Sequence, residues 1–264
     1  MKKNKKIVSY ILLFIESIVF LAITSLLVLK LTVFKESYIK RELNKNNYYE
    51  ELKDEIQTEM SYYTNQSGFE DEILENTFTL GEVKYETNKF IENTYKGKSR
   101  NIDTSKLEER LNNNIQEYIK KNNFEKVDKK EIKDFTNAMK EVYQEEIKLM
   151  GYAEKIAPSL SKLINILNNA FVVLIVLFVL LILVNNILLK NHEVGVIFYT
   201  SSFLLIFTTI FIKNNIDIKN IFIYSKLFSN VIKSIINNLF NITTIIIVVY
   251  LILGLLSSLL RRTR

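Results

Sequence analysis

The chain has 264 residues, no cysteine, no tryptophan and a single histidine, His192. These counts exclude disulfides, thiolate chemistry and cysteine-ligated zinc, and they leave almost no room for histidine-based metal or triad sites. Residues 35–165 contain 22 Lys and Arg against 26 Asp and Glu, a net charge of −4, whereas the remainder contains 13 against 3, a net charge of +10. The chain therefore divides into an acidic polar part and an apolar part with basic ends. No basic face with interleaved aromatic residues is present, so we expect no nucleic-acid partner.

Four apolar segments are long enough to cross a bilayer. The first, residues 7–29, follows a basic tip and contains one charged residue, Glu16. It is longer than the apolar core of about 7–15 residues in a cleaved signal, so we interpret it as an uncleaved span. The other spans are predicted at residues 170–189, 194–212 and 242–260. The resulting division is a tip and first span (1–34), a large loop domain (35–165), a second span (166–190), a third span (194–212), a second loop (213–241), and a fourth span with a basic tail (242–264).

Flanking charge predicts the orientation of the spans. Both chain tips are short and basic, and an even number of crossings places them on the same side. The positive-inside rule makes that side the cytoplasm. The loop domain 35–165 and the second loop then lie outside, although the second loop has a net charge of +3. Because abundant Lys, Asn and Ile are typical of an AT-rich bacterial genome, we expect a bacterial plasma membrane.

The loop domain is expected to be helical throughout. Apolar residues at four-residue steps from Ile39 to Met60 predict that the first span continues outward as a stalk, which Ser67-Gly68 ends. Further helices are predicted at 69–78 and 83–95, after Asp103, and after Asp128, where Glu131 would complete a capping box. With so many charges the apolar stripes are narrow, a pattern that favours a slim antiparallel bundle.

Two features close to the later spans also carry structural predictions. Pro158 is expected in the first turn of the second membrane helix. Apolar pairs between residues 222 and 240 recur every four to five residues with Lys and Asn between them. This pattern predicts an amphipathic helix that lies in the outer membrane interface, separate from the fourth span.

Glu16 is the candidate centre of an intramembrane polar site. A carboxyl buried at this depth is costly unless it is neutral or partnered, so it indicates an ion or proton path, a contact that locks subunits together, or a structural hydrogen bond. The expected partners are hydroxyls of the third span, and the candidate site is Glu16 with Tyr199, Ser201 and Ser202. The neutral, structural reading is favoured, and Asn185-Asn186 is interpreted in the same way, as interhelical hydrogen bonding.

Tyrosines of the loop domain form a candidate contact surface, because tyrosine is favoured at protein interfaces. The alternative is that they belong to the bundle core, with their hydroxyls at its rim. The residues concerned are Tyr48, Tyr49, Tyr62, Tyr63, Tyr85 and Tyr95.

Two resemblances accompany these patterns. The run Tyr95-Lys96-Gly97, followed by Ile102-Asp103 and Leu107 inside a four-span frame, resembles small uncharacterised four-pass membrane proteins of low-GC Gram-positive bacteria. That likeness covers most of the chain and implies no activity. The layout of one span, a large outer domain and three further spans is loosely similar to ABC permeases of the MacB/FtsX type, which carry an amphipathic coupling helix before the first span.

The sequence therefore predicts an all-α protein with four transmembrane helices and a helical-bundle extracytoplasmic domain between spans one and two. Its expected function is non-enzymatic: the outer domain binds a protein partner, as an accessory, sensor or immunity-type component. The alternative is a permease-like subunit or a small transport pathway of an ABC-type or oligomeric system. We expect no cofactor and no enzymatic activity, because no nucleophile–base pair or metal-ligand cluster appears. The lipid bilayer is the other expected partner, and a homo-oligomer is compatible with this interpretation.

Overall fold

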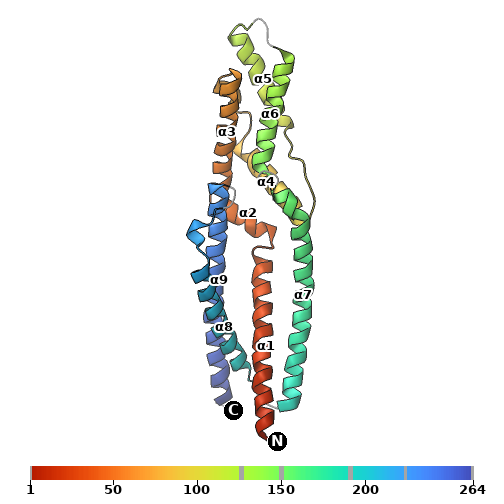
Figure 1. Cartoon of the computed structure of the whole chain (residues 1–264), viewed down its shortest axis with the longest axis vertical. Coiled ribbons are helices and arrows are strands. Elements are labelled where there is room, and N and C mark those ends of the chain that lie inside the picture. Colours follow the sequence, from red (N-terminus) through yellow and green to blue (C-terminus); the bar gives the residue numbers. More distant parts are fainter. Residues whose placement is uncertain (1, 125–127, 149–151, 190–192, 223–224, 263–264) are drawn as a thin grey trace. The chain divides into compact units, whose positions relative to one another are not determined.

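The computed structural model describes residues 2–124, 128–148, 152–189, 193–222 and 225–262, and in these residues the chain is helical with no β-strand (Figure 1). The elements in chain order are α1 (Lys2–Leu31), α2 (Glu36–Lys45), α3 (Tyr48–Ser67), the 3₁₀ helix η1 (Asp71–Leu74), α4 (Leu80–Tyr95), α5 (Ser105–Lys121), α6 (Lys129–Ile147), α7 (Tyr152–Leu189), α8 (Val194–Asn215), the 3₁₀ helix η2 (Ile218–Asn220) and α9 (Lys226–Arg262). The all-α prediction is confirmed.

The chain forms two compact units, which are described separately. The span unit consists of Met1–Tyr38, Ile164–Ile223 and Ile232–Arg264. The bundle unit consists of Ile39–Leu163 and Tyr224–Val231.

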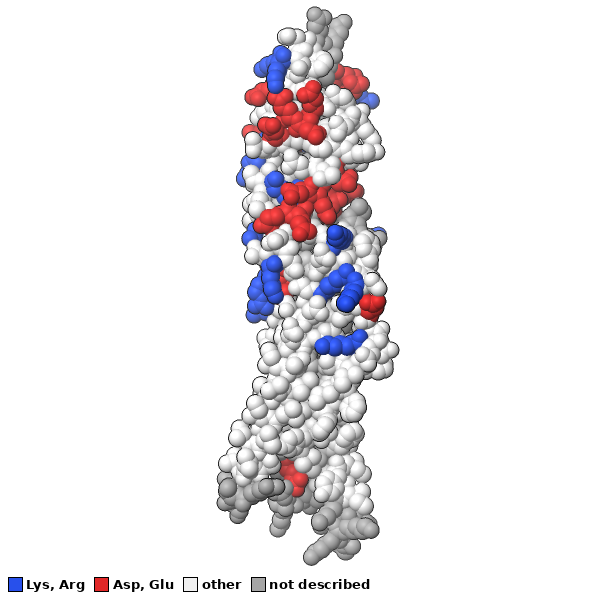
Figure 2. Space-filling model, turned by 90° about the vertical axis from the view of Figure 1, so that its left-hand side faces the viewer, with Lys and Arg blue, Asp and Glu red and all other residues white. Residues whose placement is uncertain are grey.

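Four helices are long and apolar enough to cross a membrane, as the sequence predicted. The segments are Ile7–Leu31, Ala157–Ile187, Val194–Asn215 and Lys226–Leu260. Large aliphatic and aromatic side chains remain exposed along them, and Figure 2 shows almost no charge on this part of the surface. Such a surface suits hydrocarbon rather than water, because its side chains are apolar and a helix bonds its interior backbone groups within itself. These helices indicate a multi-pass membrane protein.

Two of the spanning helices are longer than predicted. α7 has 38 residues and α9 has 37, whereas about 20 residues suffice to cross the hydrocarbon core. The sequence predicted a separate helix at 222–240 before the last span, but the structure has one uninterrupted helix, Lys226–Arg262. Pro158 lies inside α7 and not in its first turn, because the helix already begins at Tyr152. A single proline removes one backbone donor, and a helix of this length tolerates that loss.

The predicted stalk between the first span and residue 67 is wrong. α1 ends at Leu31, and α2 and α3 follow as separate helices. Asn47 separates them with a φ of 52°, a left-handed conformation that asparagine tolerates better than most residues. The end of α3 is as predicted, since Gly68 follows with a φ of 79°.

Local sequence signals explain the remaining helix boundaries of the bundle unit. α4 begins with a capping box in which Thr79 and Glu82 bond each other's backbone N–H groups. The N-cap of α5 is Thr104, one residue later than predicted, although Asp103 still accepts a bond of 3.0 Å from the Ser105 N–H. Asp128 caps α6 as predicted by accepting from the Lys130 N–H, but the predicted capping-box bonds with Glu131 are not found among the described residues.

Narrow apolar stripes form the core of the bundle unit. α3 packs against α4 and α6, and α5 packs against η1 and α6. The buried side chains include Leu52, Ile56, Met60, Val83, Phe90, Leu107, Leu111, Ile115, Met139 and Ile147. Most charged side chains between these stripes remain outside, where Asp and Glu gather in patches in the view of Figure 2, whereas Glu42 and Glu86 are buried.

Candidate functional site

The predicted intramembrane site lies in the span unit, where α1 places Glu16 against α7. The Glu16 side chain is fully buried, and its Oε1 accepts a hydrogen bond of 3.0 Å from Nδ2 of Asn185. Asn185 is also fully buried. The sequence analysis expected the partner of Glu16 among third-span hydroxyls, whereas this bond comes from the second span.

Three hydroxyls are buried with the Glu16–Asn185 pair. Ser201 Oγ donates to the backbone carbonyl of Ser17 over 3.1 Å, so it joins α8 to α1. Ser17 and Ser202 instead donate to carbonyls one turn back in their own helices. The structure thus buries two of the three hydroxyl residues of the candidate site, Ser201 and Ser202, together with Glu16.

Tyr199, the remaining predicted site residue, lies against α9. A Cβ placed on Gly254 would be only 3.0–3.1 Å from three atoms of the Tyr199 ring. Gly195 lies one turn earlier in α8. A Cβ placed on it would likewise lie close to the Gly254 carbonyl and to Ser257. Glycines at these positions let α8 and α9 approach closely, and this contact was not foreseen in the sequence analysis.

An aromatic cluster brings the four spanning helices together. The Phe20 ring of α1 lies 5.5 Å from Phe178 of α7, 5.6 Å from Phe198 of α8 and 5.2 Å from Tyr250 of α9, measured between ring centroids. The Tyr250 hydroxyl also shares a hydrogen bond with Thr24 Oγ1 in α1. Such contacts supply the packing that holds helices together where water provides no driving force.

The chemistry of the intramembrane cluster is that of an interhelical connection. One amide N–H of Asn185 is used by Glu16, while its Oδ1 has no hydrogen-bond partner among the described residues. The amide oxygen of Asn185 therefore remains available as a hydrogen-bond acceptor next to the carboxyl group of Glu16. Ser17 and Ser202 direct their hydroxyls to backbone carbonyls, so the polar groups are turned mainly toward the protein itself.

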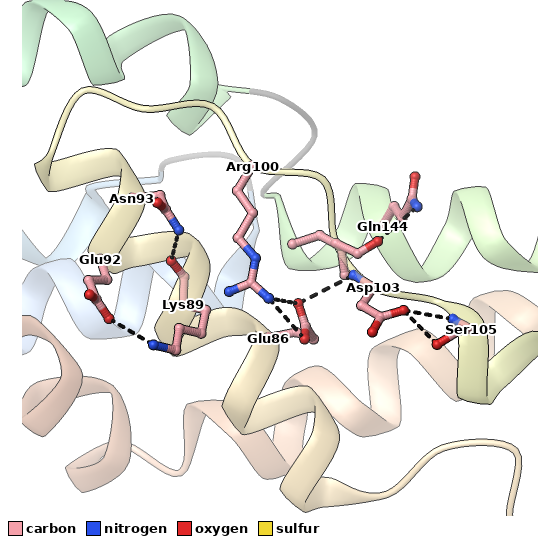
Figure 3. Close-up of polar contacts among 9 residues, drawn as sticks. Glu86, Lys89, Glu92, Asn93, Arg100, Asp103, Ser105 and Gln144 are labelled. Atoms are coloured by element: carbon pink, nitrogen blue, oxygen red, sulfur yellow. Dashed lines mark hydrogen bonds and ion pairs between the residues drawn. The ribbon is translucent and has the colours of Figure 1, made fainter.

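A second polar arrangement anchors the segment between α4 and α5 in the bundle unit (Figure 3). Glu86 of α4 is only 6% exposed and accepts two bonds, of 3.1 and 3.3 Å, from Nη2 of Arg100. It also accepts from the Asp103 N–H over 3.4 Å. Gln144 of α6 donates to the Ile102 carbonyl over 3.2 Å. These bonds fix the connector against both helices.

A cavity of about 110 Å³ lies beside this anchor. Burial, followed by the charges of Glu86, Glu82 and Asp103, raises the pKa of the Tyr143 phenol. Tyr143 therefore remains neutral and acts only as a hydrogen-bonding group. The lining residues are Phe78, Glu82, Tyr85, Glu86, Asp103, Lys106, Leu107 and Tyr143.

An apolar depression of the bundle unit, here called the aromatic groove, lies where α3 ends and α5 and α6 approach each other. It has a volume of about 440 Å³ and is lined by Ser67, Gly68, Phe69, Tyr118, Ile119, Phe124, Glu131, Ile132 and Phe135. Phe69 packs against Phe135 at 5.0 Å and against Tyr118 at 5.9 Å between ring centroids. Phe124 stacks on Tyr118 yet is 50% exposed. The walls are therefore ordered, while part of their apolar surface remains uncovered.

The six tyrosines of the predicted contact surface differ in their exposure to solvent. Tyr48 and Tyr49 are buried in the bundle core, whereas Tyr62, Tyr63 and Tyr85 are exposed. Tyr95 is half-buried. The tyrosine in the lining of the aromatic groove is Tyr118, which was not among those predicted, and the phenylalanines that form the groove were not predicted as a contact site. Phe69 and Phe135 lie 66 positions apart, so no short-range pattern links them.

Searches of protein-family models, curated proteins and solved structures found no match. Among the described residues, no group of three or more His, Cys, Asp or Glu side chains could hold a metal ion. His192 lies outside the described residues.

Proposed function

We propose that this chain is a non-enzymatic, multi-pass protein of a bacterial plasma membrane that binds a protein partner through residues 35–165. In this proposal both termini are cytoplasmic and the bundle unit lies outside. The basic chain tips support the orientation through the positive-inside rule. The absence of cysteine and the single histidine support a binding role over a catalytic one.

The aromatic groove is the observation that carries the proposal. Its wall is built from Phe69, Tyr118 and Phe135, whose mutual contacts hold the rings in place. Phe124 leaves half of its surface exposed to solvent at the edge. Rigid aromatic pockets of this kind accept apolar anchor residues at protein interfaces, and little entropy is lost because the walls are already ordered.

The partner that fits this groove is an amphipathic helix with apolar anchors. An open depression between helix ends accepts side chains spaced one turn apart, as in helix-in-groove recognition. Glu131 is the charged residue in the lining and would face the polar edge of such a helix. The exposed Tyr62 and Tyr63 lie on the last turns of α3, next to Ser67 and Gly68 of the groove, and extend the surface available for contact.

A permease-like or pathway function is the alternative, and the buried cluster around Glu16 is the feature that favours it. Polar groups within spans commonly mark ion or substrate pathways. Here the amide of Asn185 bonds Glu16, and Ser201 bonds the backbone of Ser17. Groups that bond between helices in this way support packing of the spans more than passage of a solute, so partner binding remains the leading proposal.

Site-specific photo-crosslinking in living cells tests the proposal. A photoreactive amino acid is placed at Phe124 or Ile132 in the groove and, as a control, at Asn113, an exposed position on α5 that does not line it. We expect one and the same protein to be crosslinked from both groove positions and not from Asn113. The Phe124→Glu variant, crosslinked from Ile132, should lose that adduct because the carboxylate is disfavoured in an apolar contact.

Two results would contradict the proposal. Equal adducts from Asn113 and from the groove would show non-specific proximity. An unchanged adduct in the Phe124→Glu variant, in protein that accumulates normally, would show that the groove is not the binding surface.

A further inference from the structure

A second depression lies in the span unit, at the end of α8. This interfacial groove has a volume of about 780 Å³ and is open to solvent along one side. It is lined by Lys213, Asn214, Asn215, Ile216, Asp217, Ile218, Lys219, Asn237, Phe240 and Asn241. The lining combines cationic and amide side chains with three large apolar side chains, whereas the spans are almost entirely apolar.

The position of the interfacial groove follows from the pairing of α8 with α9. Lys213 Nζ lies 5.0 Å from the ring centroid of Phe240, and Gly195 lies against Gly254 in the same helix pair. Eighteen residues of α8 separate Gly195 from Lys213, which corresponds to about 27 Å of helix. This length matches the hydrocarbon core of a bilayer, about 30 Å. The groove therefore lies where the spans leave the hydrocarbon and meet the headgroups.

The polar lining of the groove suits a phosphate group. Lys213 and Lys219 are exposed and supply two ammonium groups from neighbouring elements, the end of α8 and η2. Asparagine amides of α8 and α9 add further N–H donors to the same depression. Asp217 is the opposing charge, and its Oδ2 accepts a bond of 2.7 Å from Asn220. Two lysines against one aspartate leave a net positive groove.

The apolar lining of the groove suits the remainder of a phospholipid. Ile216 and Phe240 line the groove next to the cations, and Phe240 belongs to the same turn of α9 as Asn241. A free phosphate ion would leave these side chains without a contact, whereas a lipid would cover them with its glycerol and upper acyl carbons. Basic pockets between spanning helices are known to hold anionic headgroups for this combined reason.

We propose that the groove formed by Lys213, Lys219, Asn237 and Phe240 binds the phosphate of an anionic phospholipid headgroup. Lys213 and Lys219 contact the phosphate oxygens, Asn237 donates to them, and Phe240 contacts the glycerol and upper acyl region. Asp217 opposes the ligand's charge and limits its affinity. This site is independent of the aromatic groove and of any protein partner.

Native mass spectrometry of the full-length protein in detergent, titrated with phosphatidylglycerol, tests this inference. Lys213→Gln and Lys219→Gln should each weaken the first bound lipid about fivefold, the usual contribution of one lysine near an anionic lipid. Asp217→Asn should strengthen it by a similar factor, because it removes the opposing charge. Lys226→Gln, at an exposed lysine that does not line the groove, is the matched control and should change nothing.

The same titration with phosphatidylcholine and with inorganic phosphate identifies the ligand class. Binding of phosphatidylglycerol well above either one supports the proposal. Equal binding of phosphatidylcholine overturns the requirement for an anionic headgroup, and equal binding of inorganic phosphate overturns the assignment to a lipid. The opposite effects expected for Asp217→Asn and the lysine variants cannot result from misfolding. Lysine variants that bind like the parent would refute the site.

Discussion

Nδ2 of Asn185 donates a hydrogen bond of 3.0 Å to Oε1 of Glu16, although 169 positions separate the two residues in the sequence and both side chains are fully buried. The bond joins the first spanning helix to the second. The hydrocarbon core of the membrane contains no water. If either Glu16 or Asn185 is replaced, the remaining polar group must therefore find another hydrogen-bond partner.

The Glu16–Asn185 pair should contribute to stability as one interhelical hydrogen bond. We expect Glu16→Gln to be nearly neutral, because the amide oxygen still accepts from Asn185. Glu16→Leu and Asn185→Leu should each destabilise the protein by about 1 kcal/mol, the scale measured for such bonds in membranes. Thermal unfolding in detergent measures the effect, and a double-mutant cycle should show that the two losses are not additive.

Thr208→Val is the matched control for this pair, since Thr208 is an exposed span residue bonded to carbonyls of its own helix. Liposome flux separates the structural role from transport. If Glu16→Gln abolished a flux that the parent protein supports, Glu16 would belong to a pathway and the structural interpretation would be wrong.

Gly254→Ala should destabilise the contact between α8 and α9. The added methyl group would meet the Tyr199 ring at 3.0–3.1 Å, and overpacking of this kind costs about 1–3 kcal/mol. Gly81→Ala serves as the control, because the nearest neighbour of the added methyl group would be Thr79 Oγ1 at 3.8 Å. Unfolding temperatures in detergent should fall for Gly254→Ala only. Replacing Tyr199 by leucine as well should restore part of the loss, and a failure to do so would argue against this contact.

Arg100→Ala should release the connector between α4 and α5. It removes two hydrogen bonds from Glu86, whose carboxylate is almost fully buried, and an unpaired buried charge costs about 3–5 kcal/mol. Limited proteolysis should then cut between residues 97 and 104 much faster than in the parent protein. Lys98→Ala, at an exposed residue of the same connector, is the control. Equal cleavage of both variants would mean that Glu86 does not hold the connector through Arg100.

Stability of the bundle unit should depend on pH through Glu146. Burial, followed by the charges of Glu55, Glu59 and Glu145, raises the pKa of Glu146 to about 6. The folded protein then holds this proton more tightly than the unfolded chain. The resulting stabilisation is complete below the ordinary pKa of about 4.5 and is lost as the pH rises through 6. Because the side chain is partly exposed and solvent screens its charge, we expect less than about 1 kcal/mol.

Glu146→Gln tests this dependence, because it removes the charge and preserves the shape. The variant should unfold at a higher temperature than the parent at pH 7.5 and at nearly the same temperature at pH 4.5. Glu109→Gln, at an exposed glutamate of α5, should show no such difference. A lower unfolding temperature of Glu146→Gln at pH 7.5 would contradict the expected sign.

The proposed orientation can be measured directly, because the chain has no cysteine of its own. Single cysteines at Ser61 and Asn113 of the bundle unit should react with an impermeant thiol reagent in intact cells. A cysteine at Glu193, at the start of α8, should react only after permeabilisation. The reverse pattern would place the termini outside.

The spans and most bundle helices follow from local patterns, so the sequence sufficed to predict them. Long apolar runs need no tertiary information, and Gly68 and Asp128 act on backbone groups within a few residues of themselves. The break at Asn47 was missed because asparagine adopts the left-handed conformation only in some contexts. The continuity of α9 was missed because the Lys and Asn residues before 242 change the polarity of the chain without interrupting its helix.

The candidate site was predictable only in part for a different reason. A buried carboxyl signals that a partner is needed, and both the third-span hydroxyls and Asn185 were visible as polar residues. The choice between them depends on which helix faces Glu16, and this is set by packing between distant segments. The aromatic groove depends on the same kind of information, since Phe69, between α3 and η1, meets Phe135 of α6 only when these distant segments pack together.

The position of Phe20 has a consequence for biosynthesis. Its aromatic partners belong to α7, α8 and α9, and Tyr250 follows Phe20 by 230 positions in the sequence. During translation the first helix enters the membrane long before the ring that completes its surroundings has been made. Until then Phe20 faces lipid or the insertion machinery, so the four-helix arrangement can close only after α9 has been made. A ribosome that stalls before residue 250 would leave an open intermediate for membrane proteases to remove.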